Sequence, residues 1–231
     1  MKSVIIFFTL LVLTQLILGV VTNEYECDAF KVKSNVGYHI ITFNNTGTKF
    51  GVVEDGERDY DFYVNSNFFT KSADIIGGLV IDGENIKSQF KGGGSFTVKN
   101  GKPNIEFGRN NKVDHLSQSL VWIVKNNRLN TTMLAKDHAN KKVMRLLLGK
   151  NKNNEIVLIH SNKFNLVTMK EIANVAQSVG ITDAIILDSG SSVDLYISHE
   201  KYEHSIKAVP SIIKRVIGID EPVAYIVGSF N

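Results

Sequence analysis

The sequence predicts an α+β fold, in which a mainly antiparallel or mixed β-sheet body carries one main helix. Short β-branched and aromatic runs recur along the chain, turn residues separate them, and one segment has helical periodicity. One helix among many strands argues against a doubly wound sheet. No internal repeat, linker or change of composition divides the chain, so residues 22–231 are expected to form one domain.

The N-terminal element is an apolar run from Val4 to Val21, which follows Lys2 and ends at the polar Thr22. This pattern is typical of a secretion signal, so residues 1–21 are expected to be removed. A secreted or periplasmic protein, without stable membrane insertion after cleavage, is the resulting prediction. Because the run is also long enough to span a bilayer, an uncleaved N-terminal anchor is the alternative.

Strands are expected at residues 38–43, 50–53, 60–64, 79–81, 95–98, 120–124, 143–148 and 156–160. The segments between them contain Asp-Gly, Asn-Gly or clustered Asn residues, which suit tight turns. They are Glu54-Asp55-Gly56, Ile81-Asp82-Gly83, Lys99-Asn100-Gly101 and residues 151–154. Antiparallel pairing of sequential strands is therefore expected.

The main helix is predicted at about residues 168–179. Thr168 is a suitable N-cap, and Glu171 completes a capping box with it. Apolar residues then recur at three- and four-residue steps, and Gly180 ends the helix. A buried strand at 184–187, a polar turn and a further strand at 193–197 follow.

Composition excludes some classes of function. The formal charge of +3 is spread along the chain, and the denser basic stretch at 136–152 is interleaved with apolar residues. Nucleic acid is therefore not expected as a partner. Cys27 is the one cysteine, so no intrachain disulfide can form.

The polar turn is the first candidate site. It reads Asp188-Ser189-Gly190-Ser191-Ser192 and follows a fully apolar strand. A carboxylate at the end of a strand, beside hydroxyl groups and a glycine, can meet a ligand at the edge of a sheet. Gly190 permits close approach to the backbone, while Ser191 and Ser192 supply donors for a phosphate or a sugar hydroxyl. The alternative is a turn that Asp188 merely caps.

Four segments in order resemble the phosphodiester glycosidase family. Residues 165–197 resemble its helix, strand and Asp-Gly-Ser turn, and Asn65-Ser66-Asn67-Phe68-Phe69 resembles its Asn-Gly-Gly-aromatic-Phe segment. The strand from Arg145 to Gly149 is similar to its Arg-Thr-Ala-hydrophobic-Gly strand, and Glu221-Pro222-Val223 is similar to its closing Arg-Pro-Val segment. The resemblance covers about residues 60–231 and implies a hydrolase that cleaves a sugar 1-phosphodiester.

The resemblance assigns roles to particular residues. Asp188 would be the catalytic carboxylate, as a base, a stabiliser of positive charge or a metal ligand, and a second acid is normally expected. Arg145 would pair with the phosphate of a sugar-phosphate substrate, unless it faces solvent. Asn65 and Asn67 would contact the substrate together with Gly190, Ser191 and Ser192.

This chain also departs from the family pattern, chiefly where serine or asparagine replaces glycine and where Glu221 replaces arginine; the glycine replacements are Ser66, Asn67, Ser189 and Ser191. Two other functions therefore stay open. One is a non-catalytic binder of carbohydrate or glycophosphate that retains the fold, and the other is a secreted structural protein.

Other catalytic motifs find no support in the sequence. His160 ends a strand and could approach the site, whereas His115, His138, His199 and His204 are scattered over polar loops. No zinc-ligand spacing is present, so no metal site is predicted. The Gly92-Gly93-Gly94-Ser95 run lacks the lysine and helix of a P-loop, and no Gly-x-Ser-x-Gly occurs. The sequence leaves any cofactor undetermined.

Overall fold

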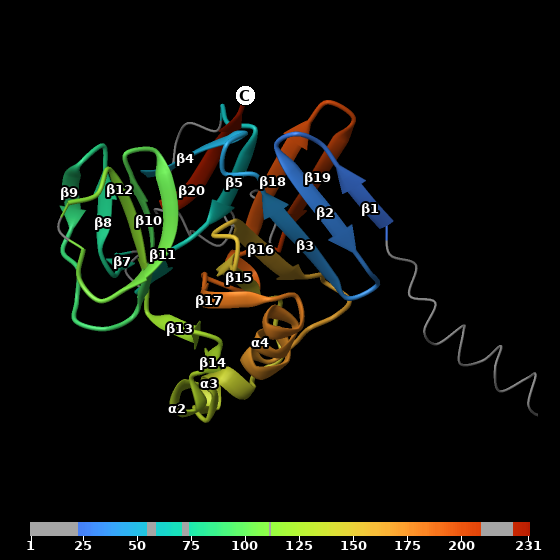
Figure 1. Cartoon of the computed structure of the whole chain (residues 1–231). Helices are drawn as coiled ribbons and strands as arrows, with labels where there is room; N and C mark the ends of the chain where they lie inside the picture. The colour runs from blue at the N-terminus through green and yellow to red at the C-terminus, as the bar shows by residue number, and fades with distance from the viewer. Residues whose placement is uncertain (1–22, 55–58, 71–73, 111, 209–223) are drawn as a thin grey trace, which may run out of the picture.

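The computed structural model describes residues 23–54, 59–70, 74–110, 112–208 and 224–231, whose strands form three main sheets (Figure 1). The predicted signal at residues 1–21, most of the turn after Glu54, and Glu221 lie outside the described residues. The described part of the chain contains no helix long and apolar enough to cross a membrane.

The largest sheet has eight strands, in the order β1 (Asn23–Glu26), β2 (Phe30–Ser34), β3 (Tyr38–Phe43), β16 (Ile156–Ser161), β15 (Leu146–Asn151), β17 (Ile181–Ile186), β13 (Val121–Lys125) and β14 (Arg128–Leu129). A second sheet has five strands, in the order β11 (Lys102–Phe107), β10 (Gly94–Lys99), β12 (His115–Ser119), β8 (Leu79–Ile81) and β9 (Glu84–Lys87). The third also has five: β19 (Tyr202–Lys207), β18 (Asp194–His199), β5 (Phe62–Asn65), β20 (Ala224–Phe230) and β4 (Thr48–Glu54). β6 (Phe68–Phe69) and β7 (Ile75–Ile76) form a separate pair.

Each predicted run lies within or overlaps a strand, and every strand pair among the described residues is antiparallel. The hairpins β8–β9 and β10–β11 turn through Asp82-Gly83 and Asn100-Gly101, all at positive φ. Positive φ at both central residues is the backbone conformation of a type I′ turn. Sequential pairing holds across these turns and for β15–β16 but is wrong elsewhere among the predicted strands. β20 lies between β4 and β5, and β17 lies between β13 and β15.

The predicted helix is α4 (Met169–Ser178), and the shorter α2 (Thr131–Leu134) and α3 (Asp137–Asn140) were not predicted. Thr168 accepts a hydrogen bond from the Glu171 backbone, and the Glu171 carboxylate accepts one from the Thr168 backbone. Both halves of the capping box are therefore present. Gly180 follows the helix at φ +81°, the left-handed conformation that glycine favours.

Replacing Thr168 by Ala is expected to lower the free energy of unfolding by about 1 kcal/mol, because two N-terminal amide groups of α4 depend on the capping box. Urea unfolding followed by circular dichroism measures this loss. Ser178→Ala, at the exposed end of the same helix, is the control and should change stability by less than about 0.5 kcal/mol. Equal stability of the two variants would contradict the role of the cap.

Alternate residues of β15 enter two separate hydrophobic clusters. Leu146 and Leu148 belong to the larger cluster, whereas Leu147 packs with Ile172 of α4 in the smaller one. A strand that is buried on both faces needs apolar residues throughout, which explains the unbroken runs of β15 and β17. In Figure 1, α4 lies against this central part of the eight-stranded sheet, where it packs on β13, β16 and β17.

Candidate active site

Backbone hydrogen bonds hold the turn from Asp188 to Ser192 between two strands. The Asp188 amide donates to the Ser66 carbonyl over 3.1 Å, and the Gly190 amide donates to the Met144 carbonyl over 2.8 Å. Ser66 directly follows β5, and Met144 lies just before β15. The turn is thus fixed where the third sheet meets the eight-stranded sheet.

Contacts inside the turn orient its first two residues. The Ser189 amide donates to Asp188 Oδ1 over 3.0 Å, and Ser189 Oγ donates to the Leu187 carbonyl over 2.8 Å. Ser189 Oγ also accepts from the Leu146 amide. The Asp188 side chain is therefore buried and positioned, while the Ser189 hydroxyl is directed back into the protein.

The second half of the turn is a short 3₁₀ helix, Gly190–Ser192. Gly190 has φ +71°, and a Cβ atom there would have Val143 Cβ, 3.9 Å away, as its nearest contact. The glycine is therefore required by backbone conformation more than by lack of space. Ser191 is exposed and Ser192 is half-buried, so both can reach a ligand from solvent.

Asn65 joins the turn to the strand that follows it. Its Nδ2 donates to the Asp188 carbonyl over 3.0 Å, and its Oδ1 accepts from the Asp194 amide over 2.8 Å. The residue is 0 % exposed. These contacts make Asn65 a positioning residue of the turn, and a direct contact between its amide and a substrate stays a prediction.

Asn67 is also 0 % exposed, but it points toward another sheet. Its Oδ1 accepts hydrogen bonds from Ser66 and Ser117, and its Nδ2 donates to the Gln118 carbonyl over 3.1 Å. The amide therefore links the segment after β5 to β12. A sugar could bind to Asn67 only by displacing one of these partners.

Replacing Asn65 by Leu is expected to lower the free energy of unfolding by about 3 kcal/mol, because a buried carbonyl and a buried amide would lose their partner. Urea unfolding at neutral pH measures the loss. Asn153→Leu, at an exposed turn position, is the matched control and should change stability by less than about 0.5 kcal/mol. An Asn65→Leu protein as stable as the parent would disprove the positioning role.

Arg145 is buried, so the alternative in which it faces solvent is wrong. Its Nη2 donates to the carbonyls of Lys141 and His138 over 2.8 and 3.2 Å, and its Nε donates to the Val167 carbonyl over 3.4 Å. Burial lowers the pKa of the guanidinium. These carbonyl groups hold the side chain between the segment after α3 and the start of α4.

The register of β15 and β17 brings Arg145 to the turn. Leu147 lies opposite Ile186, and the Leu187 amide donates to the Leu146 carbonyl. Arg145 directly precedes Leu146 and Asp188 directly follows Leu187, so the two residues lie at neighbouring strand ends, where the turn leaves the ladder. The two predicted catalytic residues therefore flank adjacent strands at one end of the sheet, and an approach of their side chains to each other stays a prediction.

Asp194 is a second buried carboxylate near the turn, which the sequence analysis did not identify. It is 3 % exposed, and Tyr225 donates a hydrogen bond to its Oδ2 over 3.2 Å. Lys207 Nζ lies 3.4 Å from the same oxygen. The sequence did contain a signal, because Asp194 follows the turn by two residues in a strand that is otherwise largely apolar.

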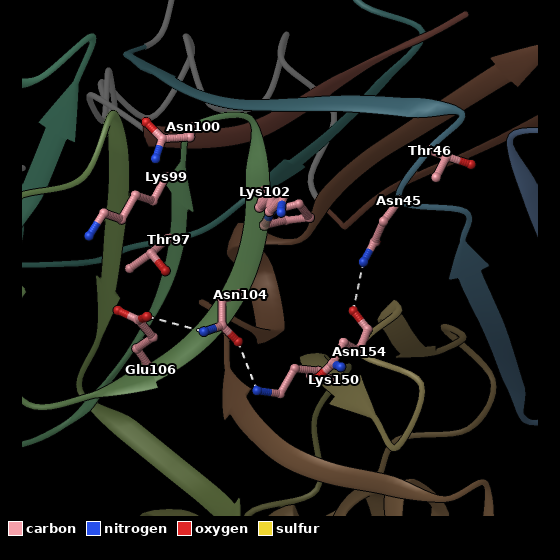
Figure 2. Close-up of a pocket in the computed structure, with 11 residues that line it drawn as sticks. Asn45, Thr46, Thr97, Lys99, Asn100, Lys102, Asn104, Glu106, Lys150 and Asn154 are labelled. Atoms are coloured by element: carbon pink, nitrogen blue, oxygen red, sulfur yellow. Dashed lines mark hydrogen bonds between the residues drawn. The ribbon is translucent and has the colours of Figure 1, made fainter.

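A separate hollow of about 630 Å³ lies at the other end of β15 (Figure 2). None of the predicted site residues lines it. Lysine and amide side chains dominate its lining, and Lys150 donates to Asn104 over 2.8 Å. Asn104 in turn donates to Glu106 over 3.1 Å. This hollow is therefore a second place where an anionic or hydroxyl-rich ligand could lie.

The fold and the turn define a known class of protein. A sequence profile of the phosphodiester glycosidase family matches residues 58–227, most of the chain, and the chain belongs to this family. The match includes Asn65, Arg145 and the turn from Asp188 to Ser192. No curated protein matches the chain in a sequence search.

Among solved structures, the chain is similar to the catalytic domain of zebrafish N-acetylglucosamine-1-phosphodiester alpha-N-acetylglucosaminidase, auto-inhibited by its pro-peptide. The TM-score is 0.65 at 14% identity, over 91% of this chain and 82% of that one. A hypothetical protein from Synechocystis gives 0.57 at 10% identity, over 91% of this chain and 61% of the other. A putative exported protein from Burkholderia pseudomallei gives 0.54 at 10% identity, over 87% and 74%. At these identities the likeness establishes the shared fold.

Proposed function

We propose that the chain is a hydrolase that cleaves the bond between the anomeric carbon of a sugar and the oxygen of a phosphodiester. The observation that carries this proposal is the placement of Asp188 directly after Leu187, whose amide is hydrogen-bonded to Leu146 next to Arg145, within a phosphodiester glycosidase domain. The turn would then be the catalytic centre, with Ser191 and Ser192 at its open side.

The reaction needs a carboxylate near the anomeric carbon and a cation near the phosphate. As water attacks that carbon, Asp188 would take the proton of the water or stabilise the positive charge that develops on the sugar. The carbon–oxygen bond breaks, and its electrons leave with the phosphate, which becomes a monoester. Arg145 would balance the phosphate charge, since a guanidinium pairs with two phosphate oxygens at once. To do so, it would exchange one of its carbonyl partners for the phosphate.

Asp194 is our candidate for the second acid that glycoside cleavage normally uses. Asn65 connects the backbone of Asp194 to that of Asp188, so the two carboxylates are held by one buried side chain. Lys207 and Tyr225 contact the Asp194 carboxylate. Asp194 would serve as a second carboxylate beside Asp188 and need not act as a proton donor. Phosphate is a good leaving group, so a dedicated donor is less necessary here.

Release of free sugar tests the proposal. The purified protein would be incubated with methyl-phosphodiesters of N-acetylglucosamine, glucose and mannose, each linked through the anomeric oxygen, and the free sugar quantified. We expect release from at least one substrate, with the corresponding phosphomonoester formed in equal amount. If no substrate in the panel is hydrolysed by folded protein, the enzymatic proposal fails.

A non-catalytic glycophosphate binder is the second candidate. Ser66, Asn67 and Ser189 favour this candidate, because each of these replacements for a family glycine directs its side chain to a backbone carbonyl of the protein itself. Calorimetry with the same phosphodiesters separates the two candidates. A binder would retain ligand without releasing sugar, whereas an enzyme would release it. A protein inert in both assays would instead fit the structural role.

We also propose that the protein is secreted or periplasmic and acts on a small sugar phosphate or glycan, without nucleic-acid partners. The apolar run at residues 4–21 motivates the export proposal. N-terminal sequencing of protein expressed in a secreting host tests it. A mature N-terminus near Thr22 in the medium or periplasm is expected, and an intact Met1 in the cytosol would contradict it.

A further inference from the structure

Three histidines that lie far apart in the sequence meet between two sheets. His39 of β3 and His160 of β16 are directly opposite each other in the eight-stranded sheet, and His204 comes from β19 of the third sheet. One ring nitrogen from each lies within 4.8 Å of the others. His160 is fully buried, while His39 and His204 are half-buried, so the cluster has a side open to solvent.

Hydrogen bonds arrange the three rings. His160 Nε2 and His204 Nε2 lie 2.9 Å apart, so one of them carries a proton and the other accepts it. His160 Nδ1 lies 3.4 Å from the Ser161 carbonyl, which can only accept, so the proton of His160 belongs on Nδ1. His204 is then the donor through Nε2. The His39 ring stacks over both others, with centroids 4.7 Å from His160 and 4.4 Å from His204.

These partners resemble those of metal-bound histidines. A ligating imidazole usually holds its second nitrogen by a hydrogen bond to a carbonyl, carboxylate or water, which fixes the ring and its tautomer. His160 has such a bond through Nδ1, and His39 Nδ1 is held by Ser34 Oγ at 2.8 Å. Nε2 of His39 is therefore its candidate ligand atom, and the other two are Nε2 of His160 and Nε2 of His204, which share a proton without metal.

Burial keeps the rings neutral, which is the state that binds a metal. Desolvation, with the neighbouring histidines, lowers the pKa of His160 to about 3. Desolvation and His39 lower the pKa of His204 to about 4, and desolvation also lowers the pKa of His39. Three neutral imidazoles without a carboxylate suit zinc, copper or nickel, and they do not suit magnesium or calcium.

We propose that His39, His160 and His204 form a binding site for a divalent transition-metal ion, zinc above all, through their Nε2 atoms. The ion takes the place of the proton between His160 and His204. That proton moves to Nδ1 of His204, so binding at neutral pH releases no net proton. Tetrahedral zinc needs nitrogen atoms about 3.3 Å apart, and each ring plane must point at the ion, so the stacked rings must rotate about their side-chain bonds to bind it. Water would complete the coordination on the open side.

An ion bound at this site would link two sheets of a protein that cannot form an intrachain disulfide. His204 lies on β19, the edge strand of the third sheet, and the other two ligands lie near the middle of the eight-stranded sheet. Because Cys27 is the one cysteine, a bound ion would be the one cross-link available between these strands in the described part of the chain. Its three ligands are different residues from those of the proposed catalytic turn, although His160 lies opposite Leu146, whose amide binds Ser189, and the site does not depend on that proposal.

Calorimetric titration of zinc tests the site. Protein stripped with EDTA and dialysed into chelator-free buffer at pH 7.5 should bind one equivalent of ZnCl2. Zinc at about 100 times the dissociation constant should also raise the melting temperature by about 5–10 °C. Cobalt(II) in place of zinc should give visible absorption bands of a four-coordinate ion, which report the geometry independently of any activity.

Ligand variants identify the residues. His204→Gln and His39→Gln should each weaken zinc binding by at least about 100-fold, since even loss of an outer hydrogen bond costs about 10–100-fold. His138→Gln, at an exposed position of α3, is the control and should bind zinc like the parent. The proposal is overturned if the folded parent binds no zinc at 100 µM, as an order-of-magnitude limit, or if His204→Gln and His138→Gln bind it equally. Because half-buried His39 and His204 are replaced separately, misfolding of one variant leaves the other as the test.

Discussion

Asp188→Asn is expected to lower the rate of sugar release by about 1,000-fold, the size of effect that follows the loss of a positioned acid–base group. The substitution removes the charge and basicity of the carboxylate but keeps the oxygen that accepts a hydrogen bond from the Ser189 amide. The folded turn should therefore persist. Rates would be measured as free sugar produced under saturating substrate, with circular dichroism to confirm folding.

The matched control for this substitution is Asp82→Asn. Asp82 has the same chemistry but lies in the β8–β9 turn, where its side chain is 87% exposed and where Asn suits the backbone equally well. The control should retain the full rate. If folded Asp188→Asn protein keeps more than about a tenth of the parent rate, Asp188 is not the catalytic carboxylate, even if the protein hydrolyses phosphodiesters.

Acidification is expected to destabilise the metal-free protein well before its carboxylates are protonated. The pKa values of His160 and His204 fall to about 3 and about 4 in the folded protein, below the usual value of 6.5. The unfolded chain therefore binds more protons than the folded chain below pH 6.5. The stability that the neutral histidines contribute is complete above pH 6.5. It is lost as the pH falls from 6.5 toward the pKa values of the folded protein. At pH 5 each histidine would cost about 2 kcal/mol.

Urea unfolding in EDTA at pH 7, 6 and 5 measures this effect, and His204→Gln is the comparison. The parent should lose about 4 kcal/mol between pH 7 and pH 5 if the two histidines act independently. The variant should lose about half as much over the same range. Parallel pH dependence in both proteins would show that the histidine cluster does not control acid stability.

The strands and the main helix could be predicted because local patterns determine them. The capping box at Thr168 and the turns at Asp82-Gly83 and Asn100-Gly101 involve residues that are close in sequence, and these formed as expected. The order of the strands could not be predicted in this way. β20 inserts between β4 and β5 although it comes from the end of the chain, and no short-range pattern encodes that pairing.

The same distinction applies to the site. The turn at Asp188 follows an apolar strand, and the pairing of β15 with β17 brings the residues next to Arg145 and Asp188 together at one end of the sheet. The contacts of Asn65 and Asn67 were not foreseen, because an isolated asparagine does not indicate whether its amide faces a ligand or the backbone. The histidine cluster was missed for another reason. Its members come from three strands in two sheets, so the spacing that marks metal ligands on one helix or hairpin is absent.

The central claim is that the turn from Asp188 to Ser192 binds the phosphate and sugar of the substrate. The most direct measurement is a crystal structure of the protein with a sugar 1-phosphate. We expect the phosphate within hydrogen-bond distance of Arg145 and the sugar ring beside Asp188, Ser191 and Ser192. A ligand found only in the lysine-lined hollow of Figure 2, with the turn empty at saturating concentration, would contradict the account.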